Sequence, residues 1–170
     1  NRLKQIVYFS TASILGKNNQ VVKEAELYGS DYIKSKYYAY HMIQSLPFAN
    51  KITTVFPTMV FGGDNHYPKS HITKGVYSTL HYLNYIRIIY VNGAFHFIHA
   101  DDIAKVAVYV MQNPTEQKEY VLGNKEVSIK EAITVLYTLF NKKPWFKIYV
   151  SEKTIFILAK IFRIKIGKWE

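Results

Sequence analysis

Lys4-Gln-Ile-Val-Tyr-Phe-Ser10 is a short run of β-branched and aromatic residues that ends in a small hydroxyl residue. This pattern predicts a buried strand, and the small polar residues that follow predict a functional loop. Ser30 or Asp31 can cap a helix that continues to about Ser45. The segment Lys51-Ile-Thr-Thr-Val-Phe56 then predicts a second strand. A strand, a helix and a strand in this order favour a parallel pair covered by the helix.

The rest of the chain continues this alternation. Gly62-Gly-Asp-Asn65 is a turn cluster, and Ser128 and Glu131 have the spacing of a capping box. Asp101 or Asp102 is expected to cap a helix. The predicted elements are helices at about 70–84, 101–112, 129–140 and 152–163, the last capped by Ser151, and strands near 86–91, 95–98 and 120–122. The pattern predicts an α/β fold with a mainly parallel sheet and helices on its faces.

The composition is that of a folded chain. It has 170 residues, of which 49% are apolar, enough for one sizeable core. The absence of cysteine excludes disulfides and thiolate chemistry and favours a cytoplasmic location. The longest apolar runs fall short of the roughly 20 residues that cross a bilayer. Because the chain opens with Asn1-Arg-Leu-Lys4, we expect it to be part of a longer protein.

The net charge of +10 is unevenly distributed. Residues 1–141 carry 14 basic and 10 acidic side chains, whereas residues 142–170 carry 8 basic and 2 acidic ones. The lysines are scattered singly, which favours a solvated basic surface over a nucleic-acid site. The alternative is that the C-terminal segment meets an anionic surface such as a membrane. Its apolar run Ile155–Phe162 is more typical of an amphipathic core helix.

Tyr32 and Lys36 are the strongest pair of candidate catalytic residues. On a helix they lie one turn apart on the same face. A tyrosine side chain ordinarily ionises near pH 10, and a neighbouring ammonium favours its ionised form, which makes such a pair suitable for proton transfer. Thr11 lies in the loop after the first predicted strand, where its hydroxyl can hold a substrate oxygen.

Other polar candidates have simpler explanations. His96 and His99 are three residues apart on a predicted strand, which places them on opposite faces and excludes shared metal ligation. Asp101 and Asp102 are interpreted as helix caps rather than an acid–base pair. We therefore predict no metal site.

Five segments, in this order, resemble the extended short-chain dehydrogenase/reductase family, the NAD(P)-dependent epimerases and dehydratases. They are Phe9-Ser-Thr-Ala-Ser-Ile-Leu-Gly16, Tyr32-Ile-Lys-Ser-Lys36, Pro57-Thr-Met-Val-Phe-Gly62, Phe97-Ile-His-Ala-Asp-Asp-Ile-Ala104 and the strand and helix of Tyr120–Glu131. The resemblance implies the C-terminal half of a Rossmann-like doubly wound parallel sheet plus a small substrate-binding subdomain. Residues 1–62 would belong to the dinucleotide-binding domain and 63–170 to the substrate-binding part, with 99–141 returning to the sheet.

The resemblance also implies chemistry. Thr11, Tyr32 and Lys36 would be catalytic, and NAD or NADP would be bound by Ser10, Tyr32, Lys36, Pro57 and Val60. The function implied is that of an epimerase, a dehydratase or a ketone or alcohol reductase. The helix with Tyr32 and Lys36 would form a homodimer. No nucleic-acid partner is implied.

Three departures from the family pattern affect this interpretation. A Gly-x-x-Gly-x-x-Gly turn, which binds the cofactor pyrophosphate, is absent. We therefore expect the chain alone to be inactive without a nucleotide-binding half. Phe56 and Phe95 stand where the family often has arginines, and a phenyl ring cannot clamp a diphosphate. The substrate alternatives are a sugar nucleotide and a sterol- or flavonoid-like compound. Two rival functions are a non-catalytic binding or scaffold protein and a basic nucleic-acid-binding module.

Overall fold

The structure, a computed structural model, describes residues 4–63, 66–79, 89–90, 92–114, 116–141, 148–150 and 154. These residues belong to two compact units. The first contains the chain up to Val60 and Ile98–Gly123, and the second contains Phe61–Phe97 and the chain from Asn124 to Ile166. Residues 124–141, which were expected to return to the sheet, are grouped with the second unit, and the predicted division into domains stays a prediction.

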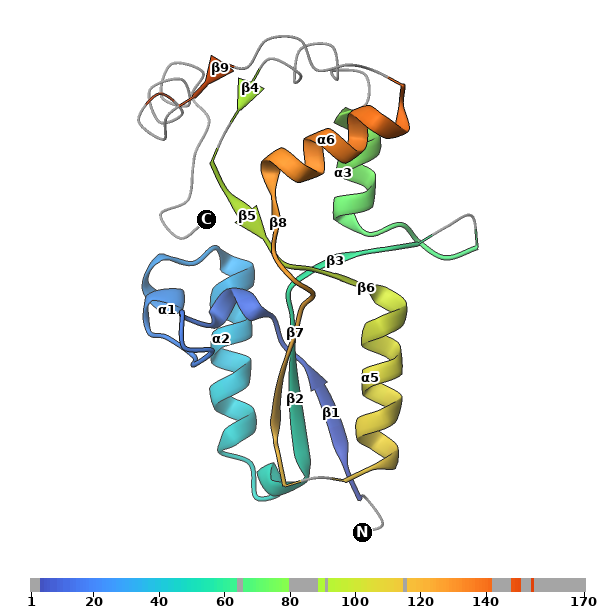
Figure 1. Cartoon of the computed structure of the whole chain (residues 1–170). Helices are drawn as coiled ribbons and strands as arrows, with labels where there is room; N and C mark the ends of the chain where they lie inside the picture. The colour runs from blue at the N-terminus through green and yellow to red at the C-terminus, as the bar shows by residue number, and fades with distance from the viewer. Residues whose placement is uncertain are drawn as a thin grey trace. The chain divides into compact units, whose positions relative to one another are not determined.

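A three-stranded parallel sheet forms the centre of the first unit (Figure 1). Its strands are β1 (Ile6–Phe9), β2 (Ile52–Pro57) and β7 (Glu119–Leu122), in the order β1-β2-β7. In the register, Phe9 lies opposite Val55, and Val55 lies opposite Tyr120. Because the strands are parallel, their carboxyl ends lie at the same edge of the sheet. The predicted α/β class with a parallel sheet is confirmed.

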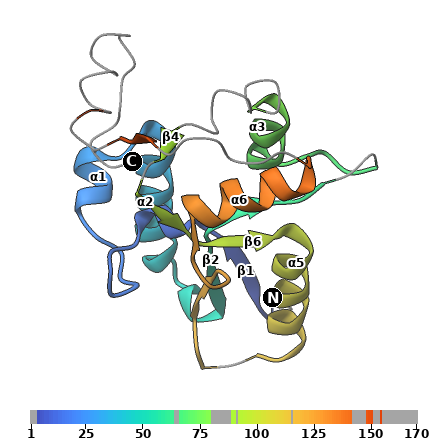
Figure 2. The ribbon, with the colours of Figure 1, turned by 45° about the horizontal axis from the view of Figure 1, so that its top comes forward.

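Helices cover both faces of this sheet. Helix α2 (Asp31–Gln44) and helix α5 (Ala100–Gln112) lie on opposite sides of it (Figure 1; Figure 2). Successive strand residues point to opposite faces. Accordingly, Phe56 joins a core with Ile33 of α2, whereas Val55 joins another core with Ile103 of α5. The first unit is therefore doubly wound.

Strand β1 was expected to be buried, and this expectation was wrong. Every residue of β2 is buried, but those of β1 are half-buried and Phe9 is 44% exposed. The reason is its position: β2 has a strand on each side, whereas β1 pairs only with β2 in the described part of the chain. Between β1 and α2 lie the 3-10 helix η1 (Ala12–Ile14) and helix α1 (Glu24–Tyr28), and η2 (Ala49–Lys51) precedes β2.

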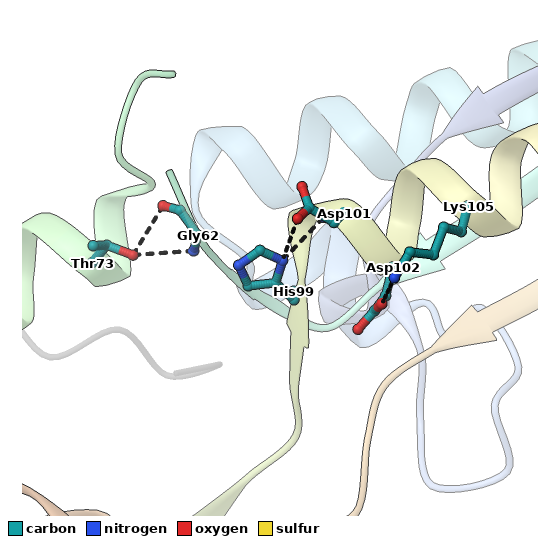
Figure 3. A network of polar contacts seen from close by, with 6 residues as sticks. All are labelled: Gly62, Thr73, His99, Asp101, Asp102 and Lys105. Atoms are coloured by element: carbon teal, nitrogen blue, oxygen red, sulfur yellow. Dashed lines mark hydrogen bonds and ion pairs between the residues drawn. The ribbon is translucent and has the colours of Figure 1, made fainter. Parts of the chain in front are cut away.

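The start of α5 corrects a second expectation. The helix begins at Ala100, so its N-cap is His99, whose Nδ1 accepts a hydrogen bond from the backbone N–H of Asp101 at 3.2 Å. Asp101 and Asp102 lie instead in the first turn, where their charge is favourable to the helix dipole. Asp102 also forms an ion pair with Lys105 at 3.0 Å (Figure 3).

The second unit is built from short elements. They are α3 (His71–Thr79), β4 (Ile89–Tyr90) paired parallel with β9 (Ile148–Tyr149), β5 (Ala94–Phe95) paired antiparallel with β8 (Val127–Ser128), and α6 (Ile129–Leu139). Strands β3 (Met59–Phe61) and β6 (Phe97–His99) form a further pair. The predicted capping box of Ser128 and Glu131 is confirmed at the start of α6.

Gly62, the residue after β3, is held by hydrogen bonds to a side chain of α3. Thr73 Oγ1 accepts from Gly62 N and donates to Gly62 O, both at 3.1 Å (Figure 3). Gly63 has a φ of +95°, and a Cβ there would lie 2.5 Å from the Pro68 carbonyl oxygen, so glycine is required. The predicted strand 95–98 is divided at His96, which lies between β5 and β6. The last predicted helix, apart from Thr154, and residues 80–88 lie outside the described residues.

Candidate active site

Ser10 continues the hydrogen bonding of the sheet by one residue beyond β1, and the chain turns from Thr11 onward. Ser10 N donates to Val55 O at 2.9 Å, and the Ser10 and Thr11 side chains are only 5% and 8% exposed. Thr11 caps η1: its Oγ1 accepts from Ser13 N and donates to Ser13 Oγ, both at 3.3 Å. Ser10 Oγ is buried and has no hydrogen-bond partner among the residues that the structure describes. An unpartnered buried hydroxyl is uncommon and calls for an explanation such as a ligand or water.

Helix α2 carries Tyr32 and Lys36 toward the end of β1. Lys36 Nζ donates to Phe9 O at 3.1 Å, which joins the helix to the last residue of the strand. The same nitrogen lies 5.9 Å from the Tyr32 ring centroid and 5.7 Å from that of Tyr8. The predicted Tyr–Lys pair is therefore adjacent, and it lies at the strand end that precedes Ser10.

Tyr32 is available to a ligand. Its side chain is 57% exposed. Within the part of the chain that the structure describes, its hydroxyl has no hydrogen-bond partner, although its backbone carbonyl accepts from Ser35 Oγ at 2.7 Å. An exposed phenol beside an ammonium is chemically suited to exchange a proton with a bound substrate.

Tyr8 is the residue near this pair that sequence reasoning missed. Burial raises the pKa of the Tyr8 phenol above its ordinary value, and the neighbouring Tyr32 raises it further. Strand alternation contained a signal for its position, because Val7 packs on the α5 side and Tyr8 must then face α2. The Phe9 carbonyl was also missed, and no residue type could have indicated it, since every residue has a carbonyl.

Pro57 and Val60 are placed differently from the other predicted cofactor residues. Pro57 is the buried last residue of β2 and lies opposite Leu122 of β7. The Val60 side chain packs into the core on the α5 side, with Val55 and Ile98. The structure thus brings Tyr32, Lys36 and the end of β1 together. The half-buried Val60 side chain packs against the core, while its main chain and the exposed part of the side chain remain for a ligand.

The described residues contain no group of three or more His, Cys, Asp or Glu side chains that could hold a metal ion. His96 Nδ1 contacts Asn124 O at 2.8 Å, and His99 caps α5. Both histidines thus have structural contacts. Among the same residues, no helix is long and apolar enough to span a membrane.

A doubly wound parallel sheet with a Ser/Thr at one strand end and a Tyr–Lys pair on the next helix is the arrangement of short-chain dehydrogenases/reductases. The chain belongs to the NAD dependent epimerase/dehydratase family, whose sequence profile matches residues 1–123. No curated protein matches the sequence significantly.

Solved structures share the fold. A nucleoside-diphosphate-sugar epimerase from Pseudomonas aeruginosa has a TM-score of 0.67 and 17% identity, over 96% of this chain and 55% of that one. dTDP-glucose 4,6-dehydratase from Bacillus anthracis, solved with NAD, has a TM-score of 0.61 and 18% identity, over 86% and 49%. UDP-N-acetylglucosamine 4-epimerase from Methanobrevibacter ruminantium has a TM-score of 0.58 and 20% identity, over 89% and 51%. The chain thus spans about half of the length of these structures.

Proposed function

We propose that this chain provides the catalytic residues of an NAD(P)-dependent epimerase, dehydratase or reductase. The observation that carries the proposal is the position of the Lys36 ammonium, which is bonded to the end of β1 and adjacent to the exposed Tyr32. Bound NAD(P) would supply or accept the hydride. Tyr32 would exchange a proton with a substrate oxygen. Thr11 would keep its bond from Ser13 N and turn its own proton from Ser13 Oγ to that oxygen.

The residues present fit the nicotinamide-ribose end of a dinucleotide. Ser10 Oγ is a buried hydroxyl to which the described part of the chain offers no partner. Lys36 Nζ uses one N–H on Phe9 O, and an ammonium has three donors, so ribose hydroxyls are suitable further partners. Ligands of open α/β sheets bind at the carboxyl ends of the strands, where these groups lie. Pro57 and the main chain of Val60 complete the proposed cofactor contacts.

We propose that the rest of the cofactor is bound by a nucleotide-binding part beyond these residues. β1 has one unoccupied edge in the described structure, and α5 packs against β1. Yet α5 leaves Val108 and Met111 exposed. An open strand edge, together with exposed apolar groups on a helix that packs against the same strand, supports a further segment there. The chain by itself would then be inactive.

Two substrate classes have separate support. The names of two of the similar solved structures refer to sugar-nucleotide epimerases, which favours a sugar-nucleotide substrate. Phe95 is an exposed aromatic residue at a position where a diphosphate-binding arginine was expected, which favours a less charged, sterol- or flavonoid-like substrate. Phe56 has no bearing on this choice, because it is buried against α2. A panel of both substrate classes, assayed by the change in NAD(P)H absorbance, decides between them.

We further propose a cytoplasmic homodimer that uses α2. Tyr37 and Tyr40 of this helix pack against the core, whereas Tyr38 and Met42 are 52% and 67% exposed, one turn apart. Leu27 of the adjacent α1 is also exposed, and Tyr38 Oη donates to Glu26 of that helix at 3.0 Å. Large exposed side chains on neighbouring helices are typical of an interface.

The proposed function is tested by isolating the protein with its nucleotide-binding part and identifying bound dinucleotide by mass spectrometry. We expect NAD or NADP to be present, and to be lost in Lys36→Met but retained in the control Lys34→Met. A protein with neither bound dinucleotide nor measurable affinity for it would instead support the non-catalytic scaffold.

A further inference from the structure

We propose that Tyr8 is a positioning residue, whose ring holds the Lys36 ammonium at the carboxyl end of β1. This inference rests on the proposed function, because Lys36 matters for turnover only if the Tyr32–Lys36 pair is catalytic. Nothing in the motif that contains Tyr32 and Lys36 requires an aromatic residue at position 8.

The geometry places two contacts on adjacent residues of one strand. Lys36 Nζ lies 5.7 Å from the Tyr8 ring centroid and 3.1 Å from the carbonyl oxygen of Phe9. A lysine ammonium within about 6 Å of a ring centroid is attracted by the electron-rich face of the ring. The side chain of a lysine otherwise samples many rotamers. A carbonyl and a ring face together restrict the ammonium more than either does alone.

The orientation of Tyr8 follows from the packing of β1. Val7 belongs to the core that contains Ile103 of α5, so the next residue faces the opposite side of the sheet. That side is covered by α2, which carries Lys36. Tyr8 is also half-buried, which limits the motion of its ring. A ring whose motion is restricted holds a flexible cation better than a mobile, exposed ring does.

Tyr8 and Tyr32 flank the same ammonium, and their environments separate their roles. The pKa of Tyr8 is raised first by burial and second by Tyr32, so Tyr8 stays a neutral phenol. A neutral ring holds the cation without competing for a proton. Tyr32 is mostly exposed and can reach a substrate. This assigns proton transfer to Tyr32 and support of the cation to Tyr8.

The contact is tested by NMR of the protein labelled with ¹³C at lysine ε carbons. The Lys36 signal is identified by its loss in Lys36→Arg. We expect its ε protons to be shifted upfield by the rings of Tyr8 and Tyr32, to remain so in Tyr8→Phe, and to lose the Tyr8 part of this shift in Tyr8→Leu. Tyr38→Leu is the matched control, since Tyr38 has no contact with Lys36, and it leaves the signal in place. An upfield shift that is the same in Tyr8→Leu as in the unsubstituted protein overturns the inference.

Graded fluorination keeps the test valid if Tyr8→Leu fails to fold. Fluorinated phenylalanines at position 8 weaken the attraction of the ring for a cation with little change in shape. In the active protein, we expect turnover to fall progressively, by on the order of ten-fold in total, with little change in KM. Tyr8→Phe retains turnover within about two-fold. Turnover that does not respond to fluorination refutes the positioning role, whereas Tyr32→Phe with full activity refutes the proposed function.

Discussion

Replacement of Tyr32 by phenylalanine separates catalysis from stability at this site. The substitution removes the phenolic proton and keeps the ring, with its position 5.9 Å from Lys36 Nζ. General acid–base catalysis contributes about 10²–10⁴-fold to a rate, so we expect turnover to fall at least 100-fold, or about 2.7 kcal/mol in activation free energy. The measurement is steady-state turnover of the protein together with the proposed nucleotide-binding part.

The structure predicts almost no effect of the same substitution on folding. The Tyr32 side chain is 57% exposed, and in the described part of the protein its hydroxyl has no hydrogen-bond partner to lose. The free energy of unfolding should therefore change by less than about 0.5 kcal/mol in denaturant melts. Tyr38→Phe is the control, because it removes the hydroxyl of a similarly exposed tyrosine of α2, one that bonds Glu26. Undiminished turnover of Tyr32→Phe would refute the assignment of Tyr32 as the acid–base residue.

Four further predictions follow from the same contacts. Lys36→Met should weaken NAD(P) binding, measured by calorimetry. The free energy of unfolding should fall by less than about 1 kcal/mol, because only one partly exposed hydrogen bond is removed. An unchanged affinity would contradict the role of Lys36 in binding the cofactor. The 170-residue chain alone should bind NAD(P) more weakly than micromolar, and a micromolar calorimetric affinity would show that it holds a complete site. Burial and the hydrogen bond to Glu119 raise the pKa of Tyr40 well above its ordinary value. The neutral phenol therefore stabilises the folded state fully below about pH 10, and this stabilisation is lost as the pH rises further. In denaturant melts between pH 8 and pH 11, the free energy of unfolding of the unsubstituted protein should fall more steeply with pH than that of Tyr40→Phe. Equal slopes would show that ionisation of Tyr40 does not affect stability. Met42→Asp should convert the proposed dimer to a monomer in light scattering, whereas an unchanged mass would exclude this face.

Much of the fold follows from local patterns that the sequence contains. The β-branched runs before Ser10 and Pro57 became parallel neighbours, and the helix between them begins at Asp31 as expected. The capping box at Ser128 was read correctly, because both of its hydrogen bonds are made within four consecutive residues. Such features depend on short-range geometry, which tertiary packing rarely changes.

Expectations that depended on contacts between distant parts of the chain were less successful. An apolar run predicts a strand but not how many strands flank it, and β1 is half-buried because the described structure gives it one partner. Asp101 and Asp102 are good capping residues by type, yet α5 starts one residue earlier and His99 accepts the capping hydrogen bond. The contact of Val60 with a cofactor stays a prediction, and the structure adds that part of its side chain packs against the core that contains Ile98.

The sequence by itself determined the chemical groups of the site and their local spacing. Tyr32 and Lys36 share a helix face because 3.6 residues make one turn. Thr11 follows a run of β-branched and aromatic residues that is typical of a strand. Only the tertiary structure decided what the Lys36 ammonium contacts. Its partners, the Phe9 carbonyl and the Tyr8 ring, lie 27 and 28 residues away along the chain, and the packing of α2 on β1 brings them within reach. Backbone carbonyls are chemically alike in every residue, so three-dimensional packing alone selects which of them binds the cation.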